Sequence, residues 1–217
     1  MADLDFLDSR DSFDFGNSVD HIEPRVALLL AGGEGRRMNY QNKGLVTFKG
    51  EPLVAHVIRR LMPQVGSLVI SANADLEAYR AFGFPVVEDT PAIKGLGPLA
   101  GIASALPHLP KRGWLQLASC DGPLIPLNMT ERLIEFAEKN NLNAAYPTAG
   151  GRDQYGYFVA RIEQLHYVNQ LLDQRQLRIR GLLEYLGAKV CPFDEASDAK
   201  AFTNCNSADQ LQILERE

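Results

Sequence analysis

Glycines and then basic residues follow an apolar run that begins at residue 25, and this order suits the binding of a chain of phosphates. Gly32 and Gly33 can adopt positive φ angles and expose backbone N–H groups to an anion, because glycine has no Cβ atom. Arg36, Arg37 and Lys43 then supply fixed positive charge. The segment predicts a triphosphate cradle; the alternative is an ordinary glycine-rich turn with arginines on the surface.

Spacing separates this segment from two familiar phosphate loops. A P-loop ends in Lys-Ser or Lys-Thr after a glycine, whereas Lys43 is preceded by Asn42 and followed by Gly44. A dinucleotide fingerprint needs a third glycine at the position that Met38 occupies. We therefore expect a phosphate loop of another kind.

A carboxylate follows a predicted strand at Asp121, within the run Ala118 to Pro123. Mg²⁺ binds one or two protein carboxylates and completes its shell with water and phosphate oxygens, so Asp121 is the candidate magnesium ligand. The alternative is an aspartate that forms the turn or caps a helix. For Asp89, in a Glu-Asp-Thr-Pro sequence, the two interpretations are a residue of the site at a strand end and an aspartate that only forms the turn.

Short apolar runs alternate with amphipathic segments from residue 25 onward, which predicts an α/β fold with a mostly parallel sheet. Strands are expected at 25–30, 67–71, 85–87, 114–119, 155–160 and 189–193, and helices at 75–82, 98–106, 163–172, 177–186 and 207–214. Two further helices are expected to start with Pro52 as first residue and with Thr130 as cap.

Polar side chains sit at the ends of four of these strands. Gly32 follows the first strand, Ser71 and Asn73 end the second, Asp89 ends the third, and Asp121 ends the strand at 114–119. Ligands of open parallel sheets bind at the carboxyl ends of the strands, near the point where the strand order reverses. The four strand ends are therefore expected to form one site.

Composition limits the class of protein. The chain has 217 residues and a net charge of -5, which argues against a general nucleic-acid or membrane surface. Residues 1–24 are strongly acidic and are expected to form a flexible extension, whereas residues 25–217 are expected to form a single domain. No apolar stretch is long enough to span a membrane.

Cysteine and histidine usage indicates neither disulfides nor a transition metal. Cys120, Cys191 and Cys205 are widely separated, which fits a reducing cytoplasm. The four histidines have no metal-ligand spacing. Asn204 and Asn206 flank Cys205, and on an extended segment both amides would line one wall.

With these residues assembled, the chain resembles the molybdenum cofactor guanylyltransferases from about residue 25 to residue 215. Four motifs carry the resemblance, namely residues 30–33 with 36–38 and 43–44, residues 97–101, residues 120–123 and residues 202–206. The resemblance implies a doubly wound, Rossmann-like sheet in a three-layer sandwich. It also implies a nucleotidyltransferase that moves GMP from GTP to the phosphate of molybdopterin bearing molybdenum and releases pyrophosphate.

The family's site residues can be carried over to matching positions. The resemblance implies nucleotide binding by Leu30, Ala31, Gly32, Gly33, Lys43, Ser71, Asp89 and Asp121, with Mg²⁺ as cofactor on Asp121. It implies a catalytic role for Arg37, Lys43 and Asp121, and an acceptor site at Arg178, Asn204 and Asn206. The partners would be GTP, the molybdopterin-type acceptor, and proteins that supply or receive the cofactor.

Several features keep alternatives open. The Gly32-Gly33 pair favours GTP, since related cytidylyltransferases have Leu-Ala-Ala-Gly there. The family commonly has Asn at Ser71, Asp at Asn42 and His-Pro-Thr at 154–156, where this chain reads Gln-Tyr-Gly. The alternatives are a cytidylyl- or sugar-phosphate nucleotidyltransferase, or a non-catalytic protein that binds GTP or the cofactor.

Overall fold

A mostly parallel sheet forms the centre of the fold. The structure is a computed structural model that describes residues 23–32, 42–195, 197–205, 210–211 and 214. Seven strands follow the order β10-β7-β9-β6-β1-β4-β5, and β8 pairs with β7. Their bounds are β1 Arg25–Leu30, β4 Ser67–Ser71, β5 Val86–Val87, β6 Trp114–Ser119, β7 Ala144–Ala149, β8 Arg152–Asp153, β9 Phe158–Arg161 and β10 Lys189–Phe193.

The direction of the strands agrees with the predicted fold class. β1 is parallel to β4 and β6, β4 is parallel to β5, and β10 is parallel to β7. β9 is antiparallel to β6 and β7, and β8 is antiparallel to β7. A separate hairpin joins β2 (Thr47–Phe48) to β3 (Glu51–Pro52).

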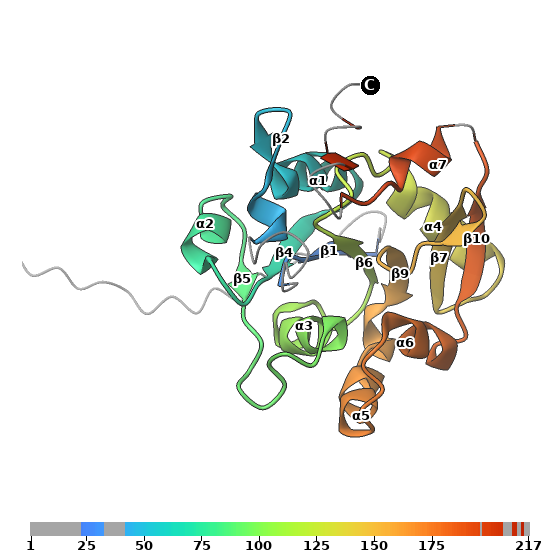
Figure 1. The fold of residues 1–217 in the computed structure, drawn as a ribbon. Helices are drawn as coiled ribbons and strands as arrows, with labels where there is room; N and C mark the ends of the chain where they lie inside the picture. The colour runs from blue at the N-terminus through green and yellow to red at the C-terminus, as the bar shows by residue number, and fades with distance from the viewer. Residues whose placement is uncertain (1–22, 33–41, 196, 206–209, 212–213, 215–217) are drawn as a thin grey trace, which may run out of the picture.

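Helices cover both faces of the sheet and confirm the three-layer sandwich (Figure 1). The α-helices are α1 Leu53–Leu61, α2 Leu76–Arg80, α3 Pro98–Ala105, α4 Met129–Lys139, α5 Tyr167–Asp173, α6 Ile179–Tyr185 and α7 Asp198–Ala201; the 3-10 helices are η1 Lys43–Leu45, η2 Met62–Gln64, η3 Leu106–His108 and η4 Ile162–Gln164. Within the described part of the chain, no helix is long and apolar enough to cross a membrane.

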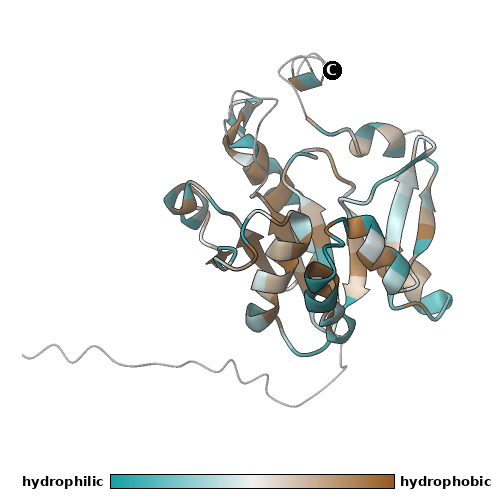
Figure 2. Ribbon diagram, turned by 60° about the horizontal axis from the view of Figure 1, so that its bottom comes forward, coloured by the Kyte–Doolittle hydropathy of each residue, from teal (hydrophilic) through white to brown (hydrophobic). Residues whose placement is uncertain are grey.

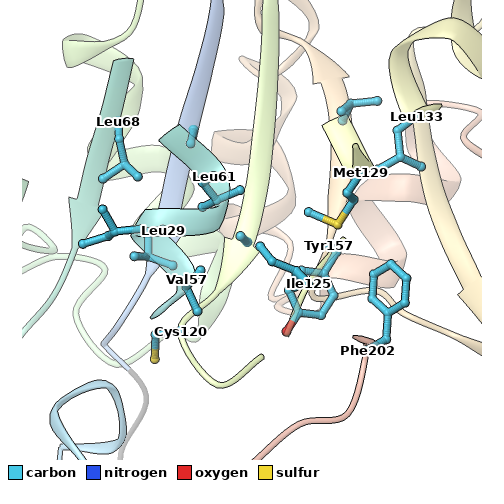
Figure 3. Packing of buried hydrophobic residues seen from close by; sticks show 14 of the residues in the cluster. Leu29, Val57, Leu61, Leu68, Cys120, Ile125, Met129, Leu133, Tyr157 and Phe202 are labelled. Atoms are coloured by element: carbon cyan, nitrogen blue, oxygen red, sulfur yellow. The ribbon is translucent and has the colours of Figure 1, made fainter. Parts of the chain in front are cut away.

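Alternate side chains of β1 supply both cores, which explains its uninterrupted apolar sequence. Ala27 and Leu29 pack with α1 and α4 on one face, whereas Val26 and Leu28 pack with α3, α5 and α6 on the other. Figure 2 shows apolar residues concentrated in the central strands and a mixture of apolar and polar residues along the helices. Figure 3 shows Leu29 in the first core, beside Val57 and Leu61 of α1.

The sheet changes its winding direction at β1. The chain runs from β1 to β4 and β5 on one side, and then returns through α3 to β6 on the other side of β1. β1 and β6 are therefore the strands between which the order reverses, and a ligand site is expected at their carboxyl ends.

Two predicted helix starts are wrong, one because of a local hairpin and the other because of a tertiary hydrogen bond. Pro52 pairs with Thr47 in the hairpin with ψ 143°, so α1 begins one residue later. Thr130 lies inside α4 and is fully buried. Its backbone N–H donates to the Gln64 side chain at 2.8 Å, so a residue distant in sequence takes the place of the expected cap.

The least regular part of the sequence contains two strands that were not predicted, β7 and the short β8. β7 contains small residues and Pro147, and it lacks the β-branched run that marks a buried strand. The strand expected at 155–160 is β9, which begins at Phe158, and the helix expected from Glu163 is η4 followed by α5. Most of the helix predicted at 207–214, and nearly all of the acidic extension at 1–24, lie outside the described residues.

Candidate active site

A cavity of about 510 Å³ lies at the carboxyl ends of β1, β4, β5 and β6. All four strand ends that the sequence places together contribute to it, so their predicted convergence is confirmed. The lining residues are Leu30, Gly32, Lys43, Ser71, Asn73, Asp89, Gly95, Gly97, Pro98, Gly101, Ser119, Cys120, Asp121, Gly156 and Ile179. The volume is within the range typical of small-molecule sites.

Lys43 and Asp121 form an ion pair in this cavity. The Lys43 Nζ contacts Asp121 Oδ2, and both side chains are more than four-fifths buried. The backbone of Asp121 is fixed as well, because the Cys205 N–H donates to its carbonyl oxygen at 2.8 Å. Asp121 Oδ1 is buried and has no hydrogen-bond partner among the described residues. Asp121 Oδ2 is thus paired with Lys43, whereas Oδ1 can still accept a hydrogen bond or bind a metal ion.

Tyr79 of α2 fixes the backbone that carries Lys43. Its hydroxyl donates to Asn42 Oδ1 at 2.5 Å, and the Asn42 amide donates to Asp75 Oδ2 at 3.1 Å. A Cβ atom at Gly44 would lie 2.5 Å from the Tyr79 hydroxyl, so glycine is required beside it. Burial raises the pKa of Tyr79, which keeps its hydroxyl a neutral donor. The neutral amide at Asn42 therefore serves this network.

Asn73 and Asp89 form a reciprocal pair at the other end of the cavity. Asn73 Nδ2 donates to Asp89 Oδ2 at 2.7 Å, and the Asp89 N–H donates to Asn73 Oδ1 at 2.9 Å. Burial raises the pKa of the Asp89 carboxyl, and the hydrogen bond from Asn73 and the nearby Ser104 hydroxyl oppose this shift. Asn73 therefore favours the ionised form of a carboxylate that burial disfavours.

Small residues let α3 approach the floor of the cavity. A Cβ atom on Gly101 would lie 2.6 Å from Ser71 Oγ and 3.0 Å from Leu30 Cδ2. Gly97, which precedes the helix, has φ +81°, a conformation that favours glycine. The Gly-Pro-Leu-Ala-Gly sequence thus positions the helix close against β1 and β4.

Tyr157 supports the loop that follows Asp121. Its ring packs against Ile125, Met129 and Phe202 (Figure 3), and its hydroxyl donates to Asn204 Oδ1 at 3.1 Å. A Cβ atom on Gly122 would lie 1.9 Å from that hydroxyl. Glycine at position 122 is therefore a steric requirement of the Tyr157–Asn204 contact.

Most of the predicted nucleotide residues reach the cavity. Leu30, Gly32, Lys43, Ser71, Asp89 and Asp121 line it, and Ala31 is tied to the β4 end by a hydrogen bond from its N–H to the Ser71 carbonyl at 2.8 Å. Arg178 is exposed beside Ile179, and Asn204 is half-buried against Tyr157; neither is among the lining residues. Gly33, Arg36, Arg37 and Asn206 lie outside the described residues.

The cavity also includes residues to which the sequence-based prediction gave no role. Asn73 was expected at the site because it ends the same strand as Ser71, and it lines the cavity, but it was given no specific role. Gly156 and Ile179 gave no such signal, since they reach the cavity only through the packing of β9 and α6.

The fold and the cavity together define a class of protein. The cavity lies where the strand order of the doubly wound sheet reverses, and several small residues line it. A lysine and a buried carboxylate lie at one end of the cavity. This is the arrangement of an α/β nucleotide-binding enzyme.

Comparison with known proteins identifies the family. Residues 27–190 match the MobA-like NTP transferase domain. Curated relatives named molybdenum cofactor guanylyltransferase include one from Ralstonia pickettii, 36% identical over 88% of this chain and 96% of the relative, and one from Acidovorax sp., 37% identical over 88% and 94%. The chain therefore belongs to the MobA-like NTP transferase family, and it is a nucleotidyltransferase.

A solved structure has the same fold. The molybdopterin-guanine dinucleotide biosynthesis protein A from Archaeoglobus fulgidus superimposes with a TM-score of 0.69 at 23% identity, covering 88% of this chain and 97% of that chain. The predicted doubly wound, Rossmann-like class is thus confirmed.

Proposed function

We propose that this protein transfers GMP from GTP to the phosphate of molybdopterin bearing molybdenum and releases pyrophosphate. The supporting observation is that Gly32, Lys43 and Asp121 line one cavity at the reversal point of the sheet. The relatives are named molybdenum cofactor guanylyltransferases, which supports the molybdenum cofactor as acceptor and the guanylyl group as the group transferred. In this proposal the reacting phosphates lie beside Lys43 and Asp121, because Lys43 is a cation and Asp121 is the candidate metal ligand.

The residues present fit Mg²⁺ at Asp121. Its Oδ1 is buried without a hydrogen-bond partner among the described residues, and the same part of the chain contains no group of three or more His, Cys, Asp or Glu residues suited to a metal. A single carboxylate that leaves the other positions to water and phosphate is the usual magnesium arrangement. When bound, the ion would neutralise phosphate charge and orient the reacting groups.

The chain's own contribution is alignment and charge. The attacking group is already an anionic phosphate, so no side chain has to deprotonate it. Lys43 offsets the charge that develops on the departing pyrophosphate. Cys120 lines the cavity but is not assigned a nucleophilic role, because burial and then the neighbouring Asp121 raise its pKa to about 12.

The acceptor is proposed to approach from the side of Arg178, Asn204 and Asn206, with Arg37 near the reacting phosphates. Asn204 suits this role because Tyr157 fixes the orientation of its amide and Cys205 joins the same segment to Asp121. The proposed location is the cytoplasm, and the proposed protein partners are those that supply or receive the cofactor.

Pyrophosphate release tests the proposal. The assay uses Mg²⁺ with GTP, CTP or ATP, each with and without molybdenum-bearing molybdopterin. Release with GTP that depends on the acceptor is expected. Preference for CTP, or release with a sugar phosphate as acceptor, would indicate one of the related transferases. GTP binding without release in the presence of the acceptor would indicate a non-catalytic protein.

A further inference from the structure

Asn73 joins three strand ends at the edge of the cavity. It follows β4, its amide bonds to Asp89 just after β5, and a Cβ atom on Gly32 after β1 would lie only 3.1 Å from its Nδ2. Both Asn73 and Asp89 line the cavity. Asn73 thus lies close to Gly32 in the loop after β1 and is hydrogen-bonded to Asp89 in the loop after β5.

The two hydrogen bonds restrict Asp89 in two ways. The bond from the Asp89 N–H to Asn73 Oδ1 fixes the backbone, while the bond from Asn73 Nδ2 to Asp89 Oδ2 fixes the carboxylate. A bond donated to a carboxylate is stronger than one between neutral groups. With Oδ2 engaged, the buried Oδ1 makes no hydrogen bond of normal geometry among the described residues, although the Ser104 hydroxyl lies near the carboxyl, and Oδ1 can accept from a ligand.

The order of the strands places this pair at the end of the cavity away from the phosphates. Asp121 follows β6, whereas Asp89 follows β5, and β1 and β4 lie between them. Neighbouring strands are about 4.8 Å apart, so the two strand ends are separated by roughly 14 Å. A triphosphate held at Lys43 and Asp121 would extend its nucleoside toward Asp89.

We propose that Asn73 is a positioning residue for nucleotide binding: it fixes the Asp89 carboxylate so that one oxygen accepts an N–H or O–H donor of the nucleoside. The proposal rests on the proposed function, because it takes the ligand to be a nucleoside triphosphate. Asn73 acts through Asp89, so its contribution disappears when Asp89 is removed.

A double-mutant cycle tests this coupling. The dissociation constant of Mg-GTP is measured by calorimetry without acceptor for the full-length wild type, Asn73→Ala, Asp89→Ala and the double variant. Asn73→Ala is expected to weaken binding about tenfold, as loss of a bond to a charged group predicts. In the Asp89→Ala background, the same change is expected to weaken binding less than twofold.

Further variants separate positioning from loss of structure. Asn73→Asp keeps the size and the acceptor for the Asp89 N–H but replaces the donor by a second carboxylate, so it is expected to weaken binding at least as much. Asn73→Ser replaces Asn73→Ala if the latter does not fold. Asn169→Ala, an exposed asparagine on α5, is the matched control. For Asn73→Ala, the KM for GTP should rise while kcat at saturating GTP changes less than about threefold.

The outcomes distinguish the two proposals. If wild type binds Mg-GTP and Asp89→Ala weakens it, but Asn73→Ala has no effect or weakens both backgrounds equally, the role of Asn73 is refuted and the proposed function stands. If wild type does not bind Mg-GTP, the proposed function fails and the role of Asn73 fails with it. If Asp89→Ala leaves binding unchanged, the positioning role is refuted.

Discussion

The Lys43 ammonium contacts the Asp121 carboxylate across 78 residues of sequence. The lysine lies on η1 beyond the glycine segment, and the aspartate follows β6 on the other side of the reversal point. Their pairing brings a phosphate-binding cation and a candidate metal ligand to one end of the cavity. Each partner has a different expected effect when it is removed.

Asp121→Asn is expected to abolish most turnover while leaving the fold intact. The change keeps the size of the side chain but removes the charge proposed to hold Mg²⁺, which should cost a factor of about 100 or more in kcat. The melting temperature should stay within a few degrees of wild type. Kinetics and thermal unfolding of the same preparation provide the check. A variant with a much lower melting temperature, whose folded molecules still turn over at the normal rate, would show that the residue is structural.

Lys43→Ala is expected to weaken nucleotide binding as well as turnover. The lysine is proposed to contact phosphates in both the bound and the reacting state, so KM for GTP should rise about tenfold and kcat should fall. Lys43→Arg keeps the charge and should retain more activity than Lys43→Ala. Unchanged kinetics in the alanine variant would remove Lys43 from the site.

Acidification is expected to weaken Mg-GTP binding through Asp89. Burial raises the pKa of this carboxyl; Asn73, Ser104 and Lys94 oppose the shift, whereas Glu88 adds to it. An ionised acceptor is therefore lost at a higher pH than for an exposed aspartate, whose pKa is about 3.9. Asp89→Ala should remove this component, and an identical pH profile in that variant would contradict the assignment.

Stability should respond to the same group in the opposite direction. A carboxyl whose pKa is raised by folding stabilises the fold fully below its unfolded pKa, and this contribution is lost as the pH rises through the folded pKa. Weaker GTP binding on acidification is therefore not explained by unfolding through Asp89. Thermal unfolding measured at each pH separates the two effects.

Gly122→Ala is expected to destabilise the protein by about 1–3 kcal/mol, the usual cost of overpacking. The added methyl would overlap the Tyr157 hydroxyl and displace it from Asn204. Tyr157→Phe in the same chain should recover part of the loss. Gly66→Ala is a matched control, because its Cβ atom would meet only ordinary contact at 3.7 Å. Equal melting temperatures for the two glycine variants would contradict the steric argument.

The site residues could be predicted from the sequence at those positions where a strand end coincides with a recognisable motif. β1 is buried on both faces and is followed, after Ala31, by Gly32, so the strand and the position of its loop could be predicted from the sequence pattern alone. Asp89 and Asp121 could be placed together because parallel strands end at one edge of the sheet. The hydrogen bonds between site residues could not be predicted, because nothing in the local sequence indicates that Asn73 bonds to Asp89.

Contacts made outside the helices explain the remaining errors. Thr130 was expected to cap a helix, but the Gln64 side chain accepts its N–H. Pro52 was expected to start a helix, but it pairs in a hairpin, and the Leu53 N–H donates to the Val46 carbonyl at 2.9 Å. Partners outside the helix override local helix propensity in both cases. The same reasoning applies to Ile179, which reaches the cavity only because α6 packs against α5, which in turn packs against α3.

The fate of two phosphorus labels tests the central claim most directly. The enzyme is incubated with Mg²⁺, molybdenum-bearing molybdopterin and GTP that carries radioactive phosphorus at either the α or the γ position. The α label is expected in the acceptor product and the γ label in pyrophosphate, in equal amounts and only when acceptor is present. Transfer of the γ label to the acceptor, or retention of both labels in GTP, would contradict guanylyl transfer.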